Sequence, residues 1–149
     1  MPTIQRVART DAGLASELRL AVMRLRRRLA VERHPDNELS LTQMTVLGTL
    51  FRHGEMTIGD LAAHERVQPP SMTRTVTGLA EAGFVQRRPH ETDGRQVLIT
   101  LTDLGRTTVV ADRERRDAWL ARQLADLTPE QRDLLREAAP LLDLLAQKD

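Results

Sequence analysis

The sequence predicts a mainly helical protein that carries one small β-hairpin. Apolar residues recur three and four positions apart through most of the chain, which is the spacing of one face of an α-helix. Between residues 84 and 101 the pattern changes to two short runs rich in β-branched and aromatic residues, which is typical of strands. Because this hairpin follows directly after two short helices, the order of elements indicates a winged helix-turn-helix.

The first predicted helix begins near Thr10 or Asp11 and carries a single apolar stripe. Five residues at helical spacing form that stripe: Leu14, Leu18, Val22, Leu25 and Leu29. The basic run at residues 24–28 lies among these positions, and we interpret it mainly as the polar face of the helix. The run His34-Pro35-Asp36-Asn37 ends the helix, because these residue types favour a turn.

Polar capping residues mark where the next two helices begin. Ser40 and Gln43 match a capping box, in which each side chain accepts a hydrogen bond from the backbone amide of the other. The second helix therefore follows Ser40 and ends near Gly54. Thr57 with Asp60 repeats the capping pattern and predicts a short third helix.

The fourth predicted helix runs from about Pro70 to Ala82. Pro69 and Pro70 suit a first helical turn, where the missing N–H group would have no acceptor, and Gly83 can adopt the left-handed conformation that ends a helix. Three apolar residues share the face that we expect to pack inward: Met72, Val76 and Leu79.

The predicted hairpin consists of residues 84–88 and 96–101. Between the two strands lies Glu91-Thr92-Asp93-Gly94, whose residue types favour turns. We therefore expect a loop that is longer than a tight turn and rich in polar residues.

Two further helices complete the predicted fold. One runs from Thr102 to about Asp126, and the last follows a capping box at residues 128–131. Pro140 is expected to kink the last helix or to loosen one of its turns. The terminal helices carry leucine stripes with too little local core to cover them, so we expect them to pair with a second copy of the chain.

Length and composition exclude several classes of protein. The 149 residues suffice for one domain. No apolar run is long enough to span a membrane, and the N-terminal residues lack the charged-then-apolar order of a signal peptide. We therefore expect a cytoplasmic protein with no membrane partner. The absence of Cys removes disulfides, thiolate nucleophiles and cysteine zinc sites. The net charge is only +1, so the overall charge does not indicate a nucleic-acid partner. Only local clusters of basic residues can indicate one.

Several short motifs follow one another from the third predicted helix to the start of the long helix. They are Leu61-Ala62, Ser71-Met72-Thr73-Arg74-Thr75-Val76 with Leu79, Gly83-Phe84-Val85, Asp93-Gly94-Arg95 and Leu101-Thr102-Asp103-Leu104-Gly105. In this order and spacing they resemble the MarR family of bacterial transcription regulators. Gly94 departs from the family pattern, which usually has a second arginine there, and so the hairpin loop loses one positive side chain.

The resemblance implies a single domain over residues 1–149, with dimerisation helices at 10–34 and 103–147 and a DNA-binding winged helix-turn-helix lobe at 40–101. It further implies a homodimeric repressor on a pseudo-palindromic operator, released by a small lipophilic or aromatic acid, with no cofactor and no enzyme activity. The alternative is a helical interaction module or scaffold that uses the same fold without binding DNA.

The residues expected to contact DNA lie on the fourth helix and on the hairpin. Arg74 can donate two hydrogen bonds to guanine, a contact worth roughly 1–3 kcal/mol of base discrimination. Arg95 is expected to be held by Asp93 while its head enters the minor groove. A solvated helix face and a structural Asp–Arg turn pair are the alternatives. The full predicted set is Gln68, Pro70, Ser71, Thr73, Arg74, Thr75, Thr77, Arg87, Arg88, His90, Asp93, Gly94 and Arg95.

Seven apolar residues are candidates to line the ligand crevice that the resemblance implies, although the same residues serve equally well as core. His64-Glu65 and Glu91 are the best candidates for metal ligands, but no closely spaced pair of ligands is visible, so we expect no metal. The histidines are scattered, and no catalytic triad or phosphate-binding loop occurs. The seven crevice candidates are Leu14, Leu18, Met44, Leu47, Phe51, Val110 and Trp119.

Overall fold

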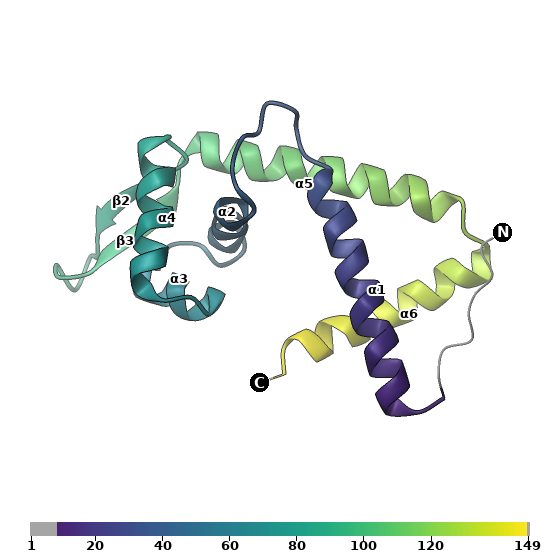
Figure 1. Ribbon diagram of the computed structural model, residues 1–149. Helices are drawn as coiled ribbons and strands as arrows, with labels where there is room; N and C mark the ends of the chain where they lie inside the picture. The colour runs from purple at the N-terminus through teal and green to yellow at the C-terminus, as the bar shows by residue number, and fades with distance from the viewer. Residues whose placement is uncertain (1–8, 149) are drawn as a thin grey trace.

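Within residues 9–148, which the computed structural model describes, the chain forms six helices and three short strands (Figure 1). The helix boundaries closely match the predicted ones. Residues 1–8 and 149, which belong to the predicted domain of 1–149, lie outside the described residues. The elements are α1 Asp11–Val31, α2 Leu41–His53, β1 Met56–Thr57, α3 Ile58–Glu65, α4 Pro69–Glu81, β2 Val85–Pro89, β3 Val97–Leu101, α5 Asp103–Ala125 and α6 Pro129–Ala146.

The predicted capping residues begin the helices as expected. The amide of Gln43 donates to the Ser40 hydroxyl over 3.1 Å, and the Ser40 amide donates to the Gln43 side chain over 2.8 Å, which confirms the capping box of α2. The same reciprocal pair joins Thr128 and Gln131 at the start of α6. At α3 the Thr57 hydroxyl accepts from the Asp60 amide. Local hydrogen bonding therefore fixes these boundaries.

The sheet has three strands in the order β1-β3-β2, where the sequence predicts a two-stranded hairpin. The pairing of β2 with β3 is confirmed and places Val85 opposite Leu101. The additional strand, β1, pairs with β3 and places Met56 opposite Ile99. With only two residues, β1 is too short to show the alternation of apolar residues by which a strand is recognised in a sequence.

The hydrophobic core lies in the lobe formed by α2, α3, α4 and the sheet, with one end of α5 packed against it (Figure 1). Its fully buried side chains include Leu47, Leu61, Val76, Leu79 and Ile99. α5 extends from this lobe toward α1 and α6 (Figure 1). The lobe is thus a compact unit, and α5 connects it to the two terminal helices.

The terminal helices α1 and α6 expose most of their apolar side chains. No residue of α1 or α6, which are both described over their full length, is buried. The exposed fraction reaches 65% at Leu134 and 60% at Leu141. Pro140 lies inside α6, and the helix continues through it without a break. On a helix that is exposed along its length, water can satisfy the carbonyl that loses its N–H partner.

Candidate nucleic-acid interface

The two faces of α4 differ sharply in burial. Met72, Val76 and Leu79 are at most 1% exposed, which confirms the predicted inward face. Arg74 and Thr73 lie on the exposed surface of the helix. Because the inward residues anchor α4 in the core, the exposed side chains are held on a rigid element.

The hydroxyl groups of α4 are partly used by the helix itself. The Thr73 hydroxyl donates to the carbonyl of Pro69 over 3.0 Å, and the Thr75 hydroxyl donates to the carbonyl of Ser71 over 3.1 Å. In this arrangement both oxygens still accept hydrogen bonds, whereas donation to a phosphate requires the hydroxyl group to rotate.

The N-terminal end of α4 presents further polar groups. Gln68 is the N-cap residue and makes no side-chain capping hydrogen bond, so its carboxamide is exposed at the helix start next to Pro70. Ser71 and Thr75 lie on the side of α4 that turns toward α2, where they line a small cavity of about 200 Å³ together with Arg26 of α1. Thr75 is therefore less exposed than Arg74.

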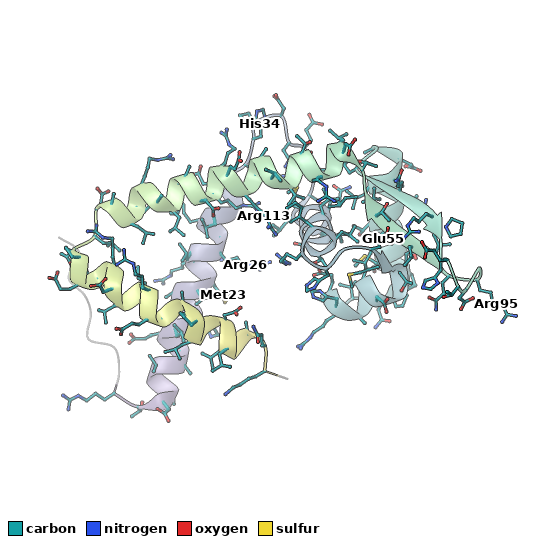
Figure 2. The ribbon with its side chains drawn as sticks, turned by 180° about the vertical axis from the view of Figure 1, so that it is seen from behind. Met23, Arg26, His34, Glu55, Arg95 and Arg113 are labelled. Atoms are coloured by element: carbon teal, nitrogen blue, oxygen red, sulfur yellow. The ribbon has the colours of Figure 1, made fainter. Side chains whose placement is uncertain are left out.

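The hairpin loop is organised by its own polar side chains. Nδ1 of His90 accepts hydrogen bonds from the amides of Thr92 and Asp93, each over 3.2 Å. The Asp93 carboxylate accepts from the backbone amide of Arg95 over 3.1 Å. This differs from the expectation that Asp93 holds the Arg95 guanidinium: the carboxylate caps the turn, and the Arg95 side chain points outward from the tip of the hairpin (Figure 2).

Two other arginines of the hairpin are engaged within the protein. The Arg87 guanidinium donates to the Thr77 hydroxyl of α4 over 3.0 Å and so links β2 to that helix. The Arg88 guanidinium forms a two-point ion pair with Glu55, in which Nε and Oε1 are 2.8 Å apart. Both residues belong to the predicted DNA-binding set, together with Gly94, which lies in the exposed loop.

Glu55 was not predicted from the sequence. It lies 33 positions from Arg88 and immediately before β1, so only recognition of that short strand would have indicated the pair. The hydrogen bond from Arg88 lowers the pKa of the Glu55 carboxyl from its ordinary value of 4.5, and the same bond raises the pKa of Arg88. The pair is therefore ionised under ordinary conditions.

A cavity of about 490 Å³ lies between α1, α2, α5 and α6. Of the seven predicted crevice residues only Met44 lines it. Leu47 is fully buried in the core, and Leu14 and Val110 are exposed. The lining includes basic side chains that the sequence analysis did not assign to a cavity: Arg26, Arg52, Arg113 and Arg116.

The remaining crevice candidates have other surroundings. Phe51 packs against the lobe core and lies 4.4 Å from the Arg113 guanidinium, measured to the ring centroid. The Arg28 guanidinium lies 4.5 Å from the centroid of the Trp119 ring, and Leu18 is half-buried. In Figure 2, Arg26 and Arg113 lie on the sides of α1 and α5 that face the lobe. The cavity therefore combines an apolar wall, to which Leu25 and Met44 belong, with basic side chains such as Arg113.

Among residues 9–148 no group of three or more His, Cys, Asp or Glu side chains is arranged to hold a metal ion. His64 lies beside Glu65, with 3.5 Å between Nδ1 and Oε1, but Glu91 pairs with Arg88 instead. In the same described part of the chain, none of the helices has the length and apolar character needed to cross a bilayer.

Comparison with known proteins identifies the family. The family model described as MarR family matches residues 39–97. An uncharacterised HTH-type transcriptional regulator of Mycobacterium bovis is 52% identical over 133 residues, which cover 89% of this chain and 92% of the relative. This identity extends beyond the lobe into the terminal helices.

Solved structures show the same fold. A provisionally assigned transcriptional regulator of Pseudomonas aeruginosa is 33% identical and has a TM-score of 0.82, with 95% of this chain and 99% of the other covered. Streptococcus pneumoniae FabT, solved in complex with DNA, has a TM-score of 0.73 over 92% of this chain and 98% of FabT, and at 16% identity it shows the fold alone. The sequence and fold together show that the chain belongs to the MarR family of transcription regulators.

Proposed function

We propose that the chain is a homodimeric repressor that binds a pseudo-palindromic operator through α4 and the hairpin. The observation that carries this proposal is the rigid presentation of Arg74 on the exposed face of α4, opposite the buried Met72, Val76 and Leu79. A helix held in this way can enter the major groove with its cationic side chain toward the base edges. Arg95, at the tip of the hairpin, then lies beside the helix and reaches the backbone or the minor groove.

The exposed apolar residues of the terminal helices support a dimer. Met23 of α1 is 51% exposed, and Leu134 and Leu141 of α6 are still more exposed. Apolar surface of this extent on neighbouring helices is typical of an interface between subunits. A two-fold dimer places two copies of α4 about one DNA turn apart, roughly 34–36 Å, which explains a palindromic operator.

The lining of the large cavity supports regulation by a small anionic ligand. Arg26, Arg113 and Arg116 line it beside apolar residues such as Leu25 and Met44, and Asp and Glu are missing from its described lining. Guanidinium groups next to an apolar wall suit a lipophilic carboxylic acid. We propose that such an acid releases the repressor from DNA by changing how α1 and α5 sit against the lobe. We propose that the protein acts in the cytoplasm.

The test measures binding to the intergenic DNA upstream of the chain's own gene. Fluorescence anisotropy gives the affinity at each of a series of salt concentrations. A DNA-binding dimer gives a linear fall of log affinity with log salt, since each neutralised phosphate contributes a slope of about −0.9. Arg19→Gln, which changes an exposed arginine of α1, is the control and should bind like the wild type. Failure to bind any sequence in a random DNA library would contradict the proposal and favour the helical interaction module.

A further inference from the structure

The ion pair of Glu55 and Arg88 connects the two outer strands of the sheet. Leu98 in the central strand β3 is paired with Thr57 of β1 on one side and with Arg88 of β2 on the other. Glu55 lies two positions before Thr57, so the carboxylate reaches across β3 to the guanidinium on the opposite strand. Figure 2 shows Glu55 beside the sheet, at the base of the hairpin that ends in Arg95.

The geometry uses the whole Arg88 head. Nε and Nη2 both donate to the Glu55 carboxylate, and Nη1 lies 3.7 Å from the carboxylate of Glu91. A planar guanidinium that donates two parallel bonds to one carboxylate is fixed in direction as well as in place. Arg88 is thus directed toward Glu55 and Glu91, whereas Arg95 extends from the tip of the hairpin (Figure 2).

We propose that Glu55 and Arg88 form a clamp that positions the hairpin for DNA binding, and that Arg88 acts through this clamp rather than as a phosphate contact. The inference rests on the proposed function. It assigns Glu55, which lies outside every predicted DNA-facing element, as a positioning residue. It also separates Arg88 from Arg95 in role, although both are arginines of the same hairpin.

The short strand β1 explains why such a clamp is needed. β1 contributes only two residues to the sheet, and a ladder of that length resists twisting of its neighbours weakly. The hairpin beyond Arg88 projects from the lobe without helices packed against its tip (Figure 1). Fixing Arg88 to Glu55 therefore fixes the direction in which the rest of the hairpin leaves the sheet.

The sign of one substitution distinguishes the clamp from simple charge effects. Glu55→Gln removes a negative charge close to the proposed DNA surface, which by Coulomb attraction alone would strengthen binding to DNA. If Glu55 positions the hairpin, the same change weakens binding. The two explanations therefore predict opposite changes in the dissociation constant.

The experiment is a double-mutant cycle of Glu55→Gln, Arg88→Gln and the combined variant, with operator affinity measured by fluorescence anisotropy. For a surface-exposed ion pair we expect each single change to weaken binding by about two- to five-fold. In the Glu55→Gln background, Arg88→Gln should have no further effect and should leave the salt slope unchanged. Arg88→Lys, which keeps the charge but loses the two-point geometry, should behave like Arg88→Gln.

The matched control is Glu91→Gln, which removes an equally charged, more exposed carboxylate from the neighbourhood of the same arginine. It should leave affinity unchanged or raise it slightly. Tighter binding by Glu55→Gln would overturn the clamp. The salt dependence gives a second criterion. If Arg88→Gln, made in the Glu55→Gln background, lowers the salt slope by about one charge per subunit, Arg88 contacts a phosphate and the clamp is overturned.

Hydrogen exchange in DNA-free protein separates failure of the clamp from failure of the proposed function. The amides of His90 and Gln96 are hydrogen-bonded to backbone carbonyls within the hairpin. Glu55→Gln should increase their exchange rates, whereas Glu91→Gln should not. Unchanged exchange in Glu55→Gln would contradict the clamp, and this result does not depend on whether the protein binds DNA.

Discussion

The buried carboxylate of Asp112 on α5 accepts a hydrogen bond of 2.7 Å from the side-chain amide of Asn37, which is 75 positions earlier in the chain. Asp112 is 1% exposed and also accepts the backbone amide of His34 over 3.2 Å. Its carboxylate thus holds the segment between α1 and α2 against the middle of α5. Asp112 therefore helps to fix how the first terminal helix joins the DNA-binding lobe.

Asp112→Ala should destabilise the fold, because it removes a buried carboxylate that accepts from the half-buried side-chain amide of Asn37. Loss of a buried hydrogen-bond partner costs about 1–3 kcal/mol in the free energy of unfolding. Urea unfolding at a fixed protein concentration measures this change in the free energy of unfolding. Asp117→Ala, at an exposed position of the same helix, is the control. Equal stability of the two variants would show that the Asp112 hydrogen bonds contribute nothing to the fold.

Gly105 should not tolerate a side chain. A Cβ atom at this buried position of α5 would overlap the carbonyl oxygen of Phe84, which belongs to the backbone and cannot rotate away. We expect Gly105→Ala to cost about 1–3 kcal/mol, as overpacked core positions do. The measurement is the thermal unfolding midpoint. Gly48→Ala, where the nearest atom lies at an ordinary contact distance of 3.8 Å, should be tolerated, and a normal midpoint for both variants would refute the close packing.

The Glu55 carboxyl should titrate below the ordinary glutamate value of 4.5, because Arg88 stabilises its ionised form. The pKa of the Glu55 carboxyl is lower in the folded state than in the unfolded state. The ion pair therefore stabilises the fold at pH values above the pKa of the unfolded state. This stabilisation is lost as the pH falls through the lowered pKa of the folded state. Carboxyl carbon NMR shifts measure the midpoint. In Arg88→Gln the midpoint should return toward 4.5, and an unchanged midpoint would show that the ion pair is absent in solution.

Arg26 and Arg113 should determine binding of lipophilic acids in the large cavity. Calorimetric titration with salicylate as the probe should show binding that weakens about ten-fold in Arg113→Gln, as expected for loss of a charge-assisted hydrogen bond. Arg19→Gln, also an arginine change but outside the described lining of the cavity, is the control. No binding across a panel of lipophilic acids would leave a constitutive repressor as the better description.

The local parts of the fold were predictable from the sequence. Capping by Ser40 and Thr128 depends on neighbours three positions away, so the residues that fix these helix starts are adjacent in the sequence. The inward face of α4 was predictable for the same reason, because helical spacing alone brings Met72 and Val76 together. The position of Arg74 on the opposite surface followed directly.

The non-local parts were not predictable. The pair of Glu55 and Arg88 depends on a two-residue strand, and the cavity depends on the angle between α1 and the lobe, which no local pattern encodes. For this reason Leu14 and Trp119 were predicted to line the crevice, whereas the cavity is lined by other residues of the first helix, among them Leu25 and Arg26. The role of Asp93 was misjudged because a carboxylate in a turn can pair with a backbone amide as well as with a nearby arginine.

Arg95→Ala should weaken binding to most DNA sequences alike. Arg95 lies at the exposed tip of the hairpin, where a guanidinium contributes charge rather than base selection (Figure 2). Its removal should lower the salt slope by about one charge per subunit. Affinity for operator and random DNA, measured over the same salt range, checks this. A loss confined to the operator would contradict the assigned role.

The most direct test of the account is the base preference of Arg74→Ala, measured by sequencing the DNA that the variant selects from a randomised operator library. If α4 reads the major groove, the variant should lose preference at one base pair in each half-site, at a cost of roughly 1–3 kcal/mol, and keep its preference elsewhere. An unchanged base preference in Arg74→Ala, with Arg95→Ala alone abolishing operator recognition, would show that α4 does not read the bases and that the hairpins recognise the shape of the site.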